Sequence, residues 1–236
     1  MSKQNKTYLI ITEKNEWKKY IKDALNKLKV SYEYKEENRF CEFDIDNKKI
    51  VFGSRCFSPG VAIDLEIMNM NFKSIKKAFR VATCGGYNPA LKVGDIVMGT
   101  DAIRSEGTTR NYFPDIGHPA VCDVLLANEI WEIMKKELKR TYMGTIWTTD
   151  GRFAGQYDPN HIENMINNKV YAVDMETAAF LVVTKYLGFP SASLSVVIDL
   201  PKEDKEFKPI DLTQKSISDS LAKCFKIHLK YIINDK

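Results

Sequence analysis

The sequence lacks the features that mark secreted, zinc-binding or membrane-spanning proteins. Its five cysteines are widely spaced and include no Cys-x-x-Cys pair, which argues against a disulfide framework and against a zinc site. The first apolar run, "YLIIT", is too short for a secretion signal or a membrane span, and no later run is long enough. We therefore expect a cytoplasmic protein that binds neither a metal ion nor a membrane.

Arginine is scarce among the basic residues, which total 35 against 31 acidic residues and give a net charge of +4. Acidic residues are interleaved with the lysines, so a solvated surface explains this charge better than a nucleic-acid site. Because the guanidinium group forms a two-pronged contact with carboxylate or phosphate, the arginines are the candidates for anion binding. They are Arg39, Arg55, Arg80, Arg104, Arg110, Arg140 and Arg152.

No Pro-, Gly- or Ser-rich linker, repeat or low-complexity tract divides the chain, so we predict one domain over residues 1–236. Apolar runs typical of buried strands alternate with segments of helical period, which indicates an α/β fold. The predicted strands are residues 7–12, 39–46, 48–54, 78–85, 94–104, 142–150 and 191–199, with Asp46 and Asn47 in the turn of a hairpin. The predicted helices are residues 15–29, 59–70, 119–139, 172–188 and 212–232.

The stretch "FRVATCGGYNP" ends a predicted strand in Gly85 and Gly86. It has neither the Gly-Lys-Ser/Thr ending of a P-loop nor the Gly-x-Gly-x-x-Gly of a dinucleotide site. Ligands of open α/β sheets gather at the carboxyl ends of strands, so bare backbone here can approach a ligand. The alternative is a tight turn that leads into Asn88 and Pro89.

Two further strand or helix ends carry carboxylates. Asp174 and Glu176 flank Met175 at the beginning of an apolar helix, where Glu176 needs a polar partner, such as the hydroxyls of a sugar. Alternatively, Asp174 caps the helix and Glu176 is exposed. Asp199 ends the run "LSVVID", where it either caps the turn before Pro201 or, with a raised pKa, donates a proton.

Together these segments resemble the family of nucleoside phosphorylases and nucleosidases, which includes purine nucleoside phosphorylase, uridine phosphorylase and methylthioadenosine nucleosidase. The resemblance covers most of the chain in matching order and rests on "RVATCGGYNPALKVGDIV", "AIRSEGTTRNYFP", "GTIWTTD", "VDMETAAF" and "VVID". It implies a mixed, strongly bent sheet flanked by helices in three layers, and assembly into a dimer or a hexamer.

The resemblance also implies roles for individual residues. Glu176 would hold the ribose hydroxyls with Met175 packed on the sugar, and Asp199 would protonate the leaving base. Arg80 matches the phosphate-binding arginine of the phosphorylases, and Thr83 lies on the sugar and phosphate side. The residues assigned to the base are Cys84, Gly85, Arg152, Phe153, Gln156 and Asp174. Arg152 stands where the family usually has an aromatic ring, so it either contacts the base or is a surface residue beside a buried Phe153.

The chain departs from the family in the loop after the first strand. The phosphorylases have Gly-Asp-Pro-x-Arg there, whereas this chain has "TEKNEW", with Glu13 at the glycine and Trp17 at the arginine. The nucleosidases have an acid near this place that orients water. Glu16 lies one position away from the matching residue and is a candidate substitute for it. The next loop, "GSRCFSPG", places Arg55 where it can help Arg80 to rebuild an anion site.

The sequence therefore predicts an enzyme that cleaves a purine nucleoside, or uridine, with inorganic phosphate to give free base and ribose 1-phosphate. Its expected partner is a small nucleoside, with no cofactor and no nucleic acid. One alternative is a nucleosidase that uses water. Another is a nucleoside-binding protein that has lost the nucleophile site.

Overall fold

The computed structural model describes residues 6–13, 17–37, 40–45, 49–55, 60, 67, 75–151, 159–201 and 214–235. The strands are β1 (Lys6–Thr12), β2 (Tyr32–Glu37), β3 (Phe40–Ile45), β4 (Lys49–Arg55), β5 (Ile75–Gly86), β6 (Ile96–Ser105), β7 (Ala120–Val121), β8 (Tyr142–Thr149), β9 (Val170–Asp174) and β10 (Ser191–Asp199). The helices are α1 (Trp17–Lys27), α3 (Val124–Glu137), α4 (Pro159–Asn167), α5 (Thr177–Leu187) and α6 (Lys215–Asn234), with a 3-10 turn, η2 (Thr109–Asn111).

All of these strands belong to one mixed sheet that is organised around β5. The strand order is β10-β6-β8-β9-β5-β1-β4-β3-β2, and β10 also pairs with β5. The strands β5, β10, β6, β8 and β9 therefore close on themselves, while β1, β4, β3 and β2 extend from β5 as an open wing. The predicted α/β fold with a mixed, bent sheet is confirmed.

The middle of β5 lies where the open wing meets the closed part of the sheet. β1 pairs with β5 in parallel as far as Thr12 opposite Val81. β9 then pairs antiparallel with Gly85 and Gly86. Residues 82–84 lie between these two pairings and belong to neither. A ligand can approach a sheet at such a break, so this part of β5 is a candidate place for a site.

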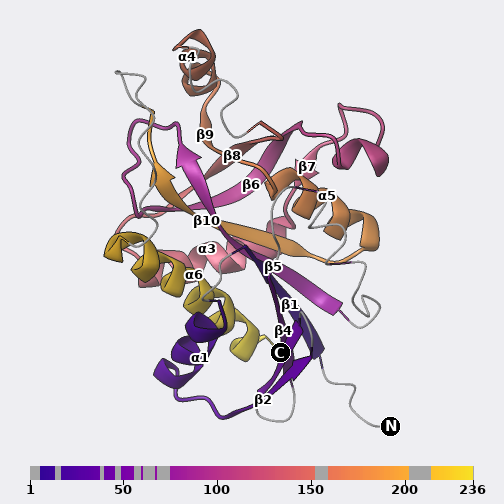
Figure 1. Ribbon diagram of the computed structural model, residues 1–236, viewed down its shortest axis with the longest axis vertical. Coiled ribbons are helices and arrows are strands. Elements are labelled where there is room, and N and C mark those ends of the chain that lie inside the picture. Colours follow the sequence, from indigo (N-terminus) through magenta and orange to yellow (C-terminus); the bar gives the residue numbers. More distant parts are fainter. Residues whose placement is uncertain are drawn as a thin grey trace.

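Helices cover both sides of the central strands (Figure 1). On one side α6 packs against β5 and β10, and α1 and α3 pack against α6. On the other side α5 contacts β6, β7, β8 and β10. This layered arrangement follows from the sequence, because α5 has eight buried residues and α6 has ten and both need apolar partners.

Trp17 fixes the first turn of α1 on the sheet. Its side chain is 1% exposed and lies over Gly53 of β4, where an added Cβ would come within 2.0 Å of the indole ring. Ile21 and Leu25, one and two turns further along, are also fully buried. Because its indole ring is buried in the core, Trp17 does not bind an anion in place of the family's arginine.

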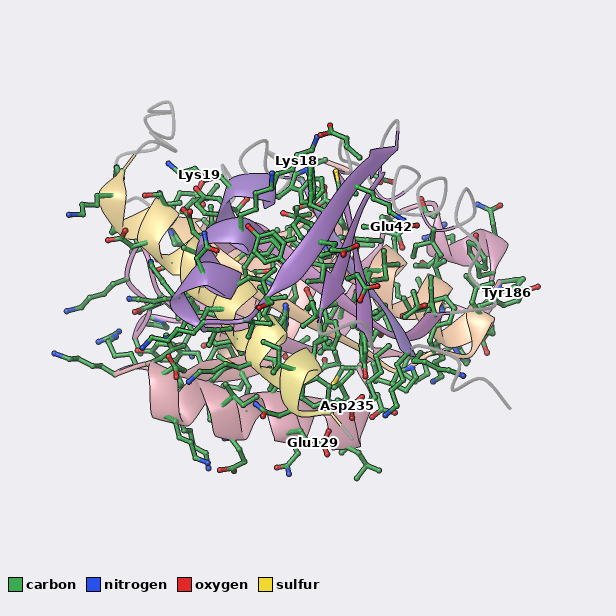
Figure 2. All side chains as sticks on the ribbon, turned by 90° about the horizontal axis from the view of Figure 1, so that it is seen from below. Lys18, Lys19, Glu42, Glu129, Tyr186 and Asp235 are labelled. Carbon is green, nitrogen blue, oxygen red and sulfur yellow. The ribbon has the colours of Figure 1, made fainter. Side chains whose placement is uncertain are left out.

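The carboxyl end of α6 is tied to the sheet and to α3. Asp235 accepts hydrogen bonds from Tyr8 of β1 and from Lys77 of β5. Tyr231 donates to Glu129 of α3 over 2.8 Å. Figure 2 shows Asp235 and Glu129 near each other at the lower edge of the view, with Tyr186 of α5 at its right. These contacts anchor the last turn of α6 to two layers.

Most predicted elements are present, with two corrections. Residues 172–188 are not one helix, because Ala172 and Val173 pair with β5 and β8 in β9, and α5 begins only at Thr177. The predicted helix 119–139 begins at Val124, after β7, and Asp123 caps it by accepting a hydrogen bond from the Leu126 amide.

The prediction missed β2, which is short and charged, and the short helix α4. Gly188 ends α5 in the left-handed conformation, at φ 85°, as the sequence predicted. The turn at Asp46 and Asn47 lies outside the described residues, as does the helix at 59–70 apart from Gly60 and Ile67, which are both helical. No helix in the described part of the chain has the length and apolarity needed to cross a membrane.

His228 of α6 is an uncharged histidine in the core. It is 0% exposed, its ring lies 4.8 Å from that of Phe79, and neither ring nitrogen has a hydrogen-bond partner within the described residues. Burial lowers the pKa of His228 from 6.5 to about 3. The unfolded chain therefore binds one more proton than the folded chain between these two values, so folding weakens as the pH falls through this window.

We expect His228→Leu to remove this acid sensitivity. Between pH 6 and pH 4, the free energy of unfolding of the unmodified protein should fall by about 2–3 kcal/mol more than that of the variant. Urea unfolding at several pH values measures this difference, since all other groups titrate alike in both proteins. If the free energies of unfolding of the two proteins changed in parallel with pH, folding would not lower the pKa of His228.

Candidate functional site

Arg80 is the centre of the candidate site. Its side chain extends from β5 and is 0% exposed, so its charge needs partners inside the protein. Nε donates to Glu13 Oε1 over 2.9 Å, Nη1 donates to Asp174 Oδ2 over 3.0 Å, and Nη2 donates to Glu176 Oε2 over 2.8 Å. Each guanidinium nitrogen therefore contacts a carboxylate.

Two hydroxyl groups complete the surroundings of Arg80. Nη1 also donates to Thr177 Oγ1 over 2.9 Å and lies 3.4 Å from Ser193 Oγ of β10. Burial alone lowers the pKa of Arg80, but the charges of Glu13, Asp174 and Glu176 outweigh it and raise the pKa above its usual value. Arg80 is therefore a permanent cation held by three acids.

The junction between β9 and α5 places Asp174 and Glu176. Asp174 ends β9, and both of its oxygens lie 3.2 Å from the amide nitrogen of Thr177, the first residue of α5. Its Oδ1 also accepts a hydrogen bond from Thr148 of β8 over 2.9 Å. Asp174 thus caps the first amide of the helix, as one of the two alternatives predicted, and it also contacts Arg80, which neither alternative included.

The same alternative predicted an exposed Glu176, and this part is wrong, because Glu176 is buried, at 5% exposure. Its carboxylate is held on Arg80 beside the helix amino terminus, where a negative charge is favoured. A carboxylate fixed in this way is ready to accept hydrogen bonds from the hydroxyls of a ligand.

Glu13 reaches Arg80 because it follows β1 directly. β1 runs parallel to β5 with Ile11 opposite Arg80 and Thr12 opposite Val81, so the next residue emerges beside the arginine. Glu13 Oε1 lies 2.9 Å from Nη2 as well as from Nε. The Glu13 side chain is 11% exposed. One carboxylate oxygen therefore covers the Nε–Nη2 edge of the guanidinium group.

Asp199 stands at the other side of the β5 strand end. It pairs with Gly85 in the parallel register of β10 and β5, and a Cβ at Gly85 would lie 2.7 Å from Asp199 Oδ1. Burial raises the pKa of Tyr87 to about 12, and the charge of Asp199 adds to this effect. Burial likewise raises the pKa of the Cys84 thiol, with contributions from Asp174 and Asp199. Because glycine has no Cβ, Gly85 leaves room for the carboxylate of Asp199 beside the end of β5.

The structure brings the central predicted residues together around β5. Arg80 contacts Asp174 and Glu176, Asp199 lies beside Gly85, and the half-buried Thr83 and buried Cys84 lie between them on β5. Met175 is half-buried at the same junction. Their ligand-binding roles stay predictions, as does base binding by Asp174, whose two oxygens both accept hydrogen bonds inside the protein.

Other predicted residues lie outside the described part of the chain. These are Arg152, Phe153, Gln156 and the side chain of Arg55. Sequence reasoning noted Glu13 but missed its contact with Arg80, and it missed Thr148, Thr177 and Ser193. The contact of Glu13 with Arg80 could have been found from the parallel pairing of β1 with β5, which places the residue after Thr12 beside the arginine. Among residues that the structure places, no group of three or more His, Cys, Asp or Glu side chains can hold a metal ion.

Comparison with known sequences gives a family match over most of the chain. The sequence model of the phosphorylase superfamily matches residues 32–233. The chain is 26% identical over 149 residues to a DeoD-type purine nucleoside phosphorylase of Colwellia psychrerythraea, covering 63% of this chain and 62% of that protein. It is 23% identical over 145 residues to a guanosine phosphorylase of Halorubrum lacusprofundi, covering 61% of this chain and 57% of that protein. The aligned regions thus span less than two thirds of these relatives.

Solved structures share the fold over almost the full chain. Uridine phosphorylase from Vibrio fischeri superposes with a TM-score of 0.81 and 17% sequence identity, covering 97% of this chain and 92% of that one. A second structure of the Vibrio fischeri protein, complexed with 6-hydroxy-1-naphthoic acid, superposes with a TM-score of 0.77, 17% identity and coverage of 94% and 91%. The same bent sheet therefore occurs in both proteins.

Proposed function

Because the chain belongs to the phosphorylase superfamily, we propose that it cleaves the N-glycosidic bond of a purine nucleoside with inorganic phosphate, releasing free base and ribose 1-phosphate. The observation that carries this proposal is the grouping of three side chains along β5, where Glu176 contacts Arg80 and Asp199 lies opposite Gly85. These residues supply a carboxylate for sugar hydroxyls, a cation for phosphate and an acid for the leaving base. Uridine is the alternative substrate.

In the proposed reaction, Glu176 accepts hydrogen bonds from the ribose hydroxyls and Met175 packs on the sugar. A phosphate oxygen held near Arg80 and Thr83 forms a bond to C1′ while the bond between C1′ and the base nitrogen breaks. The electron pair of the broken bond goes to the base, and Asp199 delivers a proton to it. The proton that hydrogen phosphate loses restores Asp199, so no other co-reactant is needed.

Hydrolysis is the second candidate function, and the position of Glu13 favours it. Glu13 covers the edge of Arg80 that phosphate would need. Water is uncharged and small, so it can attack C1′ without displacing this carboxylate. Both candidates use Glu176 and Asp199 in the same roles and differ only in the nucleophile.

Release of free base from a panel of purine, pyrimidine and 5′-methylthio nucleosides, with and without inorganic phosphate, tests the proposal. Phosphate-dependent cleavage together with formation of ribose 1-phosphate supports phosphorolysis. Cleavage at the same rate without phosphate supports hydrolysis. If no nucleoside is cleaved under either condition, the proposed activity is wrong, and tight nucleoside binding would then support the binding-protein alternative.

We expect Gly85→Ala to lower kcat/KM by about 10- to 100-fold, the usual cost of misplacing a catalytic group by about 1 Å. The new Cβ would lie 2.7 Å from Asp199 Oδ1 and 3.1 Å from Val173 Cγ1, so the Asp199 side chain must move. Steady-state kinetics of base release measure the effect. Gly107→Ala is the matched control, because among the described residues its Cβ would meet only Asp150 Oδ2, at an ordinary 3.7 Å. Equal activity of both variants would contradict this role of Gly85.

A further inference from the structure

We propose that Glu13 is an internal competitor for phosphate at Arg80 and thereby sets the selection of the nucleophile. This inference rests on the proposed function, because it assigns the phosphate site to Arg80. Phosphate gains the Nε–Nη2 edge of the guanidinium group only when the Glu13 carboxylate leaves it. Glu13 is thus a specificity-determining residue of the site.

An incoming anion can bind Arg80 at one edge of its guanidinium group. Nη1 faces inward, where Asp174, Thr177 and Ser193 surround it. The Nε–Nη2 edge presents two parallel N–H donors, the arrangement that suits two oxygens of a phosphate. Glu13 Oε1 lies 2.9 Å from both of these nitrogens. A carboxylate of the chain therefore occupies the position that best fits the oxyanion.

Charge reinforces this competition. Three carboxylates surround one guanidinium group, so the cluster carries a formal charge of −2 with all three ionised. An anion added to this cluster is repelled, and the repulsion is strong because the surroundings are buried and poorly screened. If Glu13 leaves, the remaining charge of the cluster is halved and two strong donors become available at once.

Glu13 is the carboxylate that can leave. Asp174 is held by the Thr148 hydroxyl and by the first amide of α5, and its side chain is 1% exposed. Glu176 belongs to the same strand-to-helix junction, and its side chain is 7% exposed. Glu13 follows the end of β1 and, with an 11% exposed side chain, is the most accessible of the three. Within the described residues, its hydrogen bond is to Arg80.

Phosphate affinity in Glu13 variants tests the inference. Isothermal titration calorimetry with inorganic phosphate should give a dissociation constant at least about tenfold lower for Glu13→Ala than for the unmodified protein, because one repelling charge and one competing acceptor are lost. Glu13→Gln should fall between them, since its amide oxygen still reaches Arg80 without the charge. Glu36→Gln is the control. It removes an exposed carboxylate on β2 that pairs with Lys18, so it should leave the affinity for phosphate unchanged.

Kinetics give a second, separate measure. KM for phosphate should fall at least about tenfold in Glu13→Ala, while KM for the nucleoside stays within about twofold. Phosphate affinity that is unchanged or weaker in both Glu13 variants would overturn the inference, even if the protein is an active phosphorylase. If Glu13→Ala gains phosphate affinity but no variant cleaves any nucleoside, the inference about Glu13 holds and the proposed function fails. Unchanged melting temperatures would show that the variants fold.

Discussion

Asp199→Asn is expected to lower kcat for purine nucleosides by ~10²–10⁴-fold, the usual contribution of a general acid. Asp199 ends β10 opposite Gly85, beside the strand end that carries Thr83 and Cys84. Asparagine keeps the shape of the side chain and still donates a hydrogen bond, but it has no acidic proton to give to the base. KM for the nucleoside should therefore change much less than kcat. Initial rates of base release at saturating phosphate measure both constants.

A substrate with a leaving group that needs no proton separates acid catalysis from a general loss of structure. 4-Nitrophenyl β-D-riboside is such a substrate, because nitrophenolate is a stable anion, and Asp199→Asn should affect its cleavage far less. Asp219→Asn, on the exposed face of α6, is the matched control and should behave like the unmodified protein. An equal loss of rate with both substrates would show that Asp199 does not act as a proton donor.

The strands could be predicted where burial demands apolar runs. β1 and β10 are buried over almost their full length and β5 over most of it, so their apolar runs marked them correctly. β2 was missed because "YEYKEE" is charged, and a wing strand paired with β3 alone needs few apolar residues. β9 was merged with α5 because "AVDMETAAF" is apolar in both elements, and the pairing that makes Ala172 and Val173 a strand comes from distant residues.

The candidate site was predictable to a similar degree. Glu176 and Asp199 were found because each stands at a helix or strand end within a family-like motif, and Arg80 because it is one of few arginines and lies in such a motif. The contacts of Arg80 were not predictable, because its three acids come from the residue after β1 and from the β9–α5 junction, more than 60 residues away in the chain. Only the register of the strands shows that Glu13, at the position of a glycine in the phosphorylases, faces the arginine.

The same geometry makes Arg80 a determinant of stability as well as of function. Arg80→Met is expected to lower the free energy of unfolding by about 3–5 kcal/mol, the usual cost of removing one partner from a buried ion pair. Methionine fills most of the space, so the loss comes mainly from charge. Asp174, Glu176 and Glu13 would keep their burial, at 1%, 7% and 11% side-chain exposure, but would lose their common cation. Urea unfolding at pH 7 measures the change.

Two further variants identify the cause of that loss. Arg80→Lys keeps the charge with fewer and less well-directed donors, so its stability should lie between those of Arg80→Met and the unmodified protein. Arg140→Met removes an exposed arginine that contacts Asp95 at the surface, where solvent screens the pair, and should have a far smaller effect. If Arg80→Met were as stable as the unmodified protein, the three carboxylates would have found other partners or taken up protons. The buried cation would then serve ligand binding alone, which the phosphate affinity of Arg80→Met would reveal.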